Sequence, residues 1–193
     1  MIRIVHCLAP CLLGALVLAA PAAQAAVPTP ATPVPSSAAQ QQTNVDEVSR
    51  QDRRFLREAH QVFLTELKGG WLAVEKGHCA AIRRVGAVLV RDHSQLDARL
   101  RQIADRFDVG LPTEPNAAQR AQLEKVGMLS GREFDRAWLD LLLASNRDGL
   151  RLGEHELRYG HSSAVKDLVH EASPVDDKHV SLLRDAKKQC HIG

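Results

Sequence analysis

Apolar residues recur at intervals of three and four along most of the chain after residue 48. The clearest stripe consists of Ile82, Val85, Leu89, Leu96, Leu100, Ile103 and Phe107. This is the period of an α-helix that is apolar on one face and polar on the other. The pattern predicts four long helices over residues 49–76, 80–107, 133–159 and 163–188, and a short helix over 117–129. No segment alternates for long enough to predict a β-strand.

Breaks in the pattern indicate how the helices connect. Gly77 closes the first helix as a C-cap, and Pro174 should kink the last helix or divide it in two. Residues 108–133 are too long a connection for a simple hairpin. We therefore expect an all-α, ferritin-like four-helix bundle, with up-down-down-up topology and the short helix in the crossover between the second and third long helices.

The N-terminal part has a different character. Arg3, an apolar run over residues 4–18 and the sequence Ala23-Gln24-Ala25 are typical of a cleaved signal peptide over 1–25. Residues 26–48, rich in Pro, Ala and Gln, predict a disordered linker before a helical-bundle domain over 49–193. We expect a periplasmic protein. A lipid anchor on Cys11 is a poorer fit, because Pro10 precedes it and the apolar run continues.

The remaining cysteines test both compartment and topology. Cleavage after Ala25 leaves Cys79 and Cys190, and an even pair in an exported protein predicts a disulfide; two unpaired thiols are the alternative. Cys79 lies at the first turn, and Cys190 lies just beyond the last helix. They can meet in the crossover topology but not in a simple up-down-up-down bundle. Redox chemistry at this pair is the weakest functional hypothesis, because no activating motif surrounds either thiol.

Charge and motifs exclude several function classes. Lys and Arg number 25 against 23 Asp and Glu, which argues against binding to nucleic acid or to an anionic membrane. No second apolar stretch is long enough for a transmembrane segment. There is no Gly-rich phosphate loop, and no Ser or Cys nucleophile lies in a recognisable setting. The sequence therefore favours a protein that is not an enzyme.

One polar residue interrupts each apolar stripe: Glu66, His93, Asn146 and His179. Glu66 and His93 lie at similar sequence distances on either side of Cys79, which places both about 20 Å from the same turn. Asn146 and His179 are similarly placed on either side of the turn near His161, which connects the third and fourth long helices. Four inward-facing polar groups at one level need one another, water or a ligand.

Carboxylate and imidazole on facing helices can form a metal site. Glu66, His93 and His179 are the candidate ligands, with Asp92 or Asp176 assisting, and the candidate ions are Fe, Mn, Zn and Cu. The carboxylates are fewer than a di-iron centre needs, because Val90 occupies the position of a Glu in a Glu-x-x-His motif. A structural network in which Glu66 bridges both histidines is the alternative, and non-covalent haem on the two histidines is a third.

Other polar and aromatic residues have simpler interpretations. Trp71, next to Gly69 and Gly70, is expected to be a core residue. A group near the end of the third long helix and beyond is expected to lie on the surface: Glu154, His155, Glu156, His161 and His170.

Several motifs together resemble one bacterial family: Phe55-Leu56, Glu66, Asp92-His93, Leu111-Pro112, Leu129-Ser130-Gly131, Phe134-Asp135, Trp138-Leu139-Asp140, Glu154, Pro174 and His179. The chain resembles the exported domain of unknown function 4142 over about residues 52–186. That family is often labelled putative outer membrane protein and is grouped with ferritin-like folds. The resemblance implies export and this fold. Ser145-Asn146 stands where the family usually has Asp-His, and Trp138 where Tyr is common, so one potential ligand is absent.

Two functions from different classes follow. The first is a non-enzymatic protein that acts through interactions, with an envelope protein partner or with itself, in envelope stress or surface adaptation. The second is a metal-binding ferritin-like protein whose site lies in the bundle core. The incomplete ligand set favours the first, and the polar layer favours the second.

Overall fold

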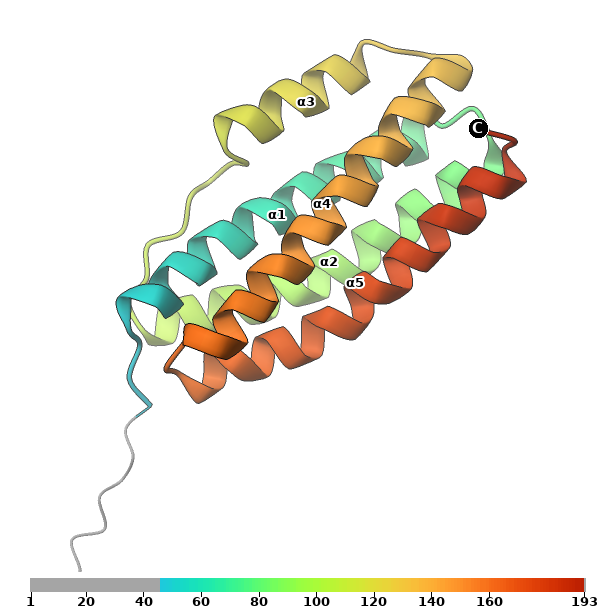
Figure 1. Ribbon diagram of the computed structural model, residues 1–193. Helices are drawn as coiled ribbons and strands as arrows, with labels where there is room; N and C mark the ends of the chain where they lie inside the picture. Colours follow the sequence, from blue (N-terminus) through green and yellow to red (C-terminus); the bar gives the residue numbers. More distant parts are fainter. Residues whose placement is uncertain (1–45, 193) are drawn as a thin grey trace, which may run out of the picture. The chain divides into compact units, whose positions relative to one another are not determined.

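The described part of the chain is entirely helical. A computed structural model describes residues 46–192, which contain no strand. The helices are α1 (Arg50–Lys76), α2 (Ala80–Arg106), α3 (Ala117–Gly127), α4 (Gly131–Tyr159) and α5 (Ser163–Gln189). The four long helices form a bundle, and α3 lies outside it against α1 and α4 (Figure 1). The all-α fold is confirmed, with helix ends within two residues of those predicted.

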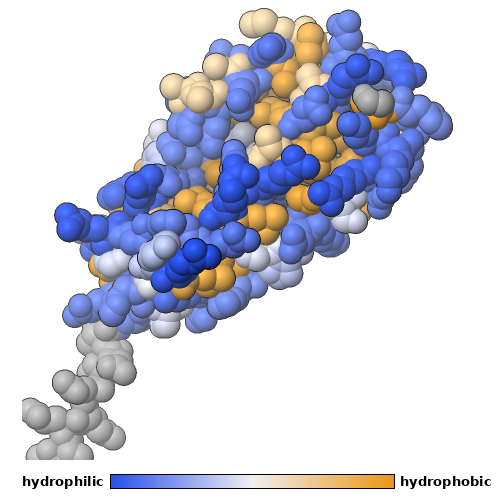
Figure 2. Space-filling model, in the orientation of Figure 1, coloured by the Kyte–Doolittle hydropathy of each residue, from blue (hydrophilic) through white to orange (hydrophobic). Residues whose placement is uncertain are grey.

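Two predicted segments lie outside the described residues: the signal peptide over 1–25 and nearly all of the linker over 26–48. Among the helices of residues 46–192, none is long and apolar enough to cross a membrane. The face of the molecule shown in Figure 2 is mostly hydrophilic, with apolar side chains along its middle.

Local sequence explains where the helices begin. Ser49 and Asp52 form a capping box at α1, in which each side chain accepts the backbone N–H of the other residue. Asn116 and Gln119 do the same at α3. Pro174 does not divide α5, which is continuous through it. A proline removes a single backbone hydrogen bond, and buried residues on both sides of it hold α5 against the bundle.

The predicted up-down-down-up topology is confirmed. Short turns make α1 antiparallel to α2 and α4 antiparallel to α5, while α1 packs on α4 and α2 packs on α5. The crossover returns the chain to the pole where α2 begins. There Asp135, in the first turn of α4, accepts the backbone N–H groups of His78 (2.9 Å) and Cys79 (2.8 Å). The helices α2 and α4 therefore start at the same pole and run parallel.

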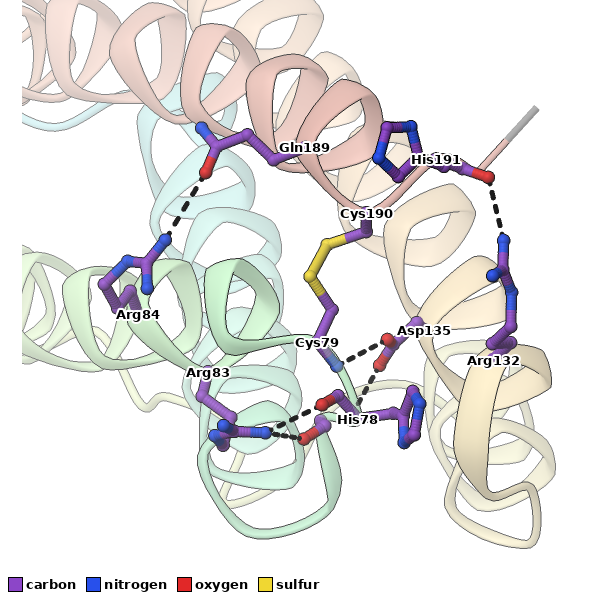
Figure 3. Close-up of a disulfide and its surroundings, with 10 residues drawn as sticks. His78, Cys79, Arg83, Arg84, Arg132, Asp135, Gln189, Cys190 and His191 are labelled. Atoms are coloured by element: carbon purple, nitrogen blue, oxygen red, sulfur yellow. Dashed lines mark hydrogen bonds between the residues drawn. A yellow bond between two sulfur atoms is a disulfide. The ribbon is translucent and has the colours of Figure 1, made fainter.

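The predicted disulfide between Cys79 and Cys190 is present (Figure 3). It joins the start of α2 to the end of α5 across 111 positions in sequence, with Cα atoms 5.9 Å apart. A bridge that closes a loop of this length restricts the unfolded chain and stabilises the fold by about 5 kcal/mol in the chain-entropy model. It fixes the two helices that carry His93 and His179 at one of their ends.

Glycines bring α1 and α2 unusually close. A Cβ on Gly70 would lie 2.9 Å from the carbonyl oxygen of Gly86, and a Cβ on Gly86 would lie 2.6 Å from the Cβ of Ala73. Neither position can accept a larger residue without separating the helices. Because Gly70 and Ala73 face α2, Trp71 points away, and it is 60% exposed. The prediction that Trp71 belongs to the core is wrong; Trp138 on α4 is the buried tryptophan.

The apolar core consists of two clusters. One lies toward the disulfide pole and includes Ala73, Ile82, Leu89, Trp138 and Leu183. The other lies toward the opposite pole and includes Phe55, Phe63, Leu96, Leu168 and Ala172. On every long helix the gap between the two clusters is occupied by buried polar residues. The polar layer expected from the sequence is therefore a real discontinuity of the core.

At the pole opposite the disulfide, two carboxyl groups are buried together. Asp52 accepts backbone N–H groups from His161 (2.8 Å) and Ser162 (3.0 Å), and it neighbours Glu156, whose carboxylate accepts from Gln51 (2.9 Å). Glu156 is fully buried, so its predicted place on the surface is wrong. Burial and the charge of Asp52 raise the pKa of Glu156 to about 7. Burial opposes the ionisation of Asp52, but its hydrogen bonds lower its pKa to about 2.

This pair predicts a pH-dependent stability. Because the folded state raises the pKa of Glu156 from 4.5 to about 7, the fold is not penalised by this group below pH 4.5 and loses stability as pH rises through 7. Replacing Glu156 by Gln keeps a neutral group that can donate a hydrogen bond to Asp52.

We expect Glu156→Gln to raise the free energy of unfolding by about 2 kcal/mol at pH 8 and to change it little at pH 4.5, as measured by urea unfolding. Glu154→Gln, at an exposed position on the same helix, is the control. Equal effects of Glu156→Gln at the two pH values would show that Glu156 ionises normally in the fold.

Candidate metal centre in the bundle core

Four ionisable side chains converge at the polar layer: Glu66 from α1, His93 from α2, and Asp176 and His179 from α5. Each offers a ligand atom, and these atoms all lie within 4.8 Å of one another. Glu66, His93 and His179 are 0% exposed and Asp176 is 5% exposed. The structure thus brings together four of the five residues that the sequence singled out as metal ligands.

Helix geometry explains this meeting. Asp176 and His179 are three positions apart, so they lie on the same face of α5. Glu66 and His93 lie on α1 and α2, and the close contact of Gly70 with Gly86 holds these helices together one turn from Glu66 and two turns from His93. Each of the four follows the apolar stripe of its own helix, and the hydrophobic packing on either side turns all of them inward.

Glu66 and His93 are in direct contact. His93 Nε2 and Glu66 Oε2 form an ion pair, but their alignment is not that of a hydrogen bond. Burial alone would lower the pKa of His93, but the Glu66 carboxylate outweighs it and raises the pKa above its usual value. The His93 ring lies between those of Phe63 and His179, at centroid distances of 5.4 and 5.0 Å.

Asp92 lies outside the group of four and holds His179 in place. Its Oδ2 is 3.0 Å from His179 Nε2, and its Oδ1 accepts from Arg91 Nε at 2.6 Å. Burial opposes the ionisation of Asp92, but the hydrogen bonds from His179 and Arg91 lower its pKa. Since Asp92 occupies Nε2, the ring of His179 presents Nδ1 to the cluster. This is the arrangement of a histidine ligand oriented by a carboxylate behind it.

Many atoms of the layer have no hydrogen-bond partner. They are Glu66 Oε1, His93 Nδ1, Asp176 Oδ1, His179 Nδ1, Ser145 Oγ and Asn146 Oδ1. Buried polar atoms in folded proteins are almost always paired, because leaving one unpaired costs about 1–3 kcal/mol. Several such atoms at one level of a well-packed bundle point to a missing common partner.

The lack of a hydrogen-bond partner is clearest at Asp176. Its Oδ1 is buried without a hydrogen-bond partner among the described residues. Burial, together with the charge of Glu66, raises the pKa of Asp176 to about 8. Burial also lowers the pKa of His179, against the hydrogen bond from Asp92. Burial and the charge of Glu66 thus favour the protonated form of Asp176 in the metal-free protein, and a bound cation would displace this proton.

The remaining long helix, α4, contributes an amide instead of a ligand. Asn146 is fully buried, and its Nδ2 donates to the carbonyl oxygen of Leu142 at 2.9 Å. This local bond leaves Asn146 Oδ1 unpaired. The alternative in which Glu66 bridges the two histidines differs from the observed contacts, because Glu66 meets His93 while His179 pairs with Asp92.

A third buried histidine was not singled out from the sequence. His60 on α1 lies 2.5 Å from Asp97 on α2, and Arg101 donates to the other carboxylate oxygen at 2.7 Å. Burial opposes the ionisation of Asp97, but these two partners lower its pKa. Because Asp97 is paired with both His60 and Arg101, the cluster of these three residues needs no further ligand. The sequence signal that could have identified His60 is its position one helical turn after Leu56, which places both side chains on the buried face of α1.

The ligand set limits the chemistry. Two imidazoles and two carboxylates suit Fe, Mn, Zn or Cu(II), and no thiolate is near. The known di-iron bundles use a Glu from each of two helices and a Glu-x-x-His motif from each of the other two. Here α4 provides Asn146, so the group fits one ion better than two.

Comparisons with known proteins support the fold and identify the family. A crystal structure of a DUF305 fragment from Deinococcus radiodurans has a TM-score of 0.64 and 13% sequence identity, covering 72% of this chain and 96% of that chain. At this identity the likeness concerns the fold alone. None of the curated proteins matches the chain at a significant level. A family model described as domain of unknown function (DUF4142) matches residues 34–185. The chain therefore belongs to the DUF4142 family.

Proposed function

We propose that the protein binds one divalent first-row transition metal ion in the core of its helical bundle. Glu66, His93, Asp176 and His179 are the ligands, and Asp92 orients His179 from behind. The observation that carries this proposal is the convergence of four buried ligand atoms within 4.8 Å of one another, several of them without a hydrogen-bond partner.

The competing explanation is a polar network that serves only to specify the fold. Such a network is stabilising when every member is satisfied, and a partly satisfied one is worse than an apolar core. Asp176 Oδ1 is buried without a hydrogen-bond partner, so Asp176 is at best a partly satisfied member of such a network. A cation supplies the missing partner of Asp176, of Glu66 Oε1 and of a ring nitrogen of each histidine at once.

The proposed compartment is the periplasm. The signal-like N-terminus and the pairing of Cys79 with Cys190 support this proposal, since disulfides persist mainly in oxidising compartments. Both cysteines of the described chain are consumed by this disulfide, so a metal site there must use other ligands. The buried imidazole and carboxylate set meets that requirement.

An interaction function has its own support. Trp71 on α1 and Met128 beyond α3 are large apolar side chains that are 60% and 84% exposed. A shallow groove between α3 and α4 is lined partly by apolar residues, among them Val126, Leu129 and Leu141. The expected envelope partner, or a second copy of the chain, could bind there without involving the core site, so the two functions are compatible.

Loss of either histidine should abolish metal binding. We expect the wild-type protein to bind one Co²⁺ per chain with visible absorption bands. His93→Ala and His179→Ala should bind none, because each removes a ligand from a buried site that has no substitute within reach. Titration of the metal-free protein with Co²⁺ measures this. His170→Ala, at an exposed position on α5, should behave as wild type. Full binding by both core variants would show that the ion lies elsewhere.

Binding should also stabilise the fold. An ion present at a hundredfold excess over its Kd adds about 2.7 kcal/mol to the free energy of unfolding, which raises the Tm of a domain of this size by several degrees. Differential scanning calorimetry with and without the ion measures this shift. An unchanged Tm at saturating Co²⁺, Fe²⁺, Mn²⁺, Zn²⁺ and Cu²⁺ would contradict the proposal.

The metal-free protein offers a separate test of the structural alternative. We expect Asp176→Asn to leave the stability of the metal-free protein unchanged or higher, because the carboxyl group that it replaces has no hydrogen-bond partner. The same variant should bind Co²⁺ at least tenfold more weakly. Asp177→Asn, at the exposed neighbouring position, controls for charge. A loss of 2 kcal/mol or more, as expected for breaking a buried network, would favour a purely structural layer.

A further inference from the structure

A narrow cleft leads from the surface to the polar layer. Its rim is formed by α4 and α5, where Gly149, Leu152 and Ser173 are partly exposed, and buried α1 residues such as Val62 and Phe63 also line it. Asp176 lies at its inner end. The open space is about 20 Å³, which is room for one water molecule.

The four core residues are not equally buried, and the one with exposed surface is the one that lines this cleft. Glu66, His93 and His179 have no exposed surface, whereas Asp176 is 5% exposed. Asp176 is also the member of the group that lines the cleft. Any ligand that exchanges with solvent therefore reaches the group of four on the side of Asp176.

A glycine on the rim leaves the approach to Asp176 open. A Cβ on Gly149 would lie 3.3 Å from Asp176 Oδ2 and 3.6 Å from Val62 Cγ1. A methyl group there would occupy the space beside the carboxylate. Glycine in a helix interior is less favourable than alanine, so helix formation does not explain glycine at this position, and a requirement for space does.

We propose that the α4–α5 cleft keeps one coordination position of the core metal open to an exchangeable water, and that Gly149 is the residue that reserves this space. The inference rests on the proposed metal site and adds to it an open position. Such a position distinguishes a centre that can bind a small ligand from a closed structural one. The size of the cleft restricts that ligand to water or a molecule of similar size.

The test uses Mn²⁺ as the probe in the full mature chain. Loss of the free-ion signal in electron paramagnetic resonance counts the bound ion, and the relaxation rate of water protons reports whether an exchanging water is coordinated to it. We expect wild type to bind one Mn²⁺ with high relaxivity. Gly149→Ala should bind the same amount but lose the inner-sphere contribution. Gly127→Ala on α3, whose Cβ would meet only Leu72 at 3.9 Å, should match wild type in both measurements.

The outcomes separate this inference from the metal site itself. High relaxivity in wild type that is lost in Gly149→Ala supports the open position. Bound Mn²⁺ with low relaxivity in wild type, or with unchanged relaxivity in Gly149→Ala, overturns the inference and leaves the metal site standing. Absence of bound Mn²⁺ in wild type, together with none of the other four ions, overturns both. Should Gly149→Ala fail to fold, Leu152→Phe, which fills the partly exposed rim of the same cleft, is measured in its place and judged by the same criterion.

Discussion

Burying two carboxylates and two imidazoles in the middle of an apolar bundle is the constraint around which this molecule is arranged. Charged groups in such surroundings are costly unless they are paired. Glu66 and His93 compensate each other in part, and Asp92 supports His179 from outside. Asp176 has no such support. The core consequently divides into two apolar clusters, one on each side of the layer.

The rest of the fold holds that layer together. The two apolar clusters pack the helices together on either side of the layer. The close approach of α1 and α2 at Gly70 and Gly86 sets the distance between Glu66 and His93. The disulfide fixes the far ends of α2 and α5, which carry the two histidines. A site built on rigid helices and supported on both sides is pre-organised for a ligand of fixed size.

Helical periodicity allowed the bundle, its topology and most of the site to be predicted, because apolar stripes and their polar interruptions are local properties of the sequence. The inward positions of Glu66, His93 and His179 follow from spacing alone. Which carboxylate would join them is harder to predict, since Asp92 directly precedes His93 and Asp176 lies one helical turn before His179, and the rotation of each helix in the bundle decides which of the two faces the layer. The burial of Glu156 and the exposure of Trp71 depend on the same rotation and on neighbours distant in sequence.

The most direct test of the central claim is the metal content of the protein as its cells make it. The chain should be exported to a periplasm, purified without a His-tag or chelator, and analysed by elemental mass spectrometry. We predict about one equivalent of a first-row transition metal per chain, and its loss in a Glu66→Ala variant. A protein that contains no metal and takes up no Fe, Mn, Zn or Cu when these are added would contradict the account.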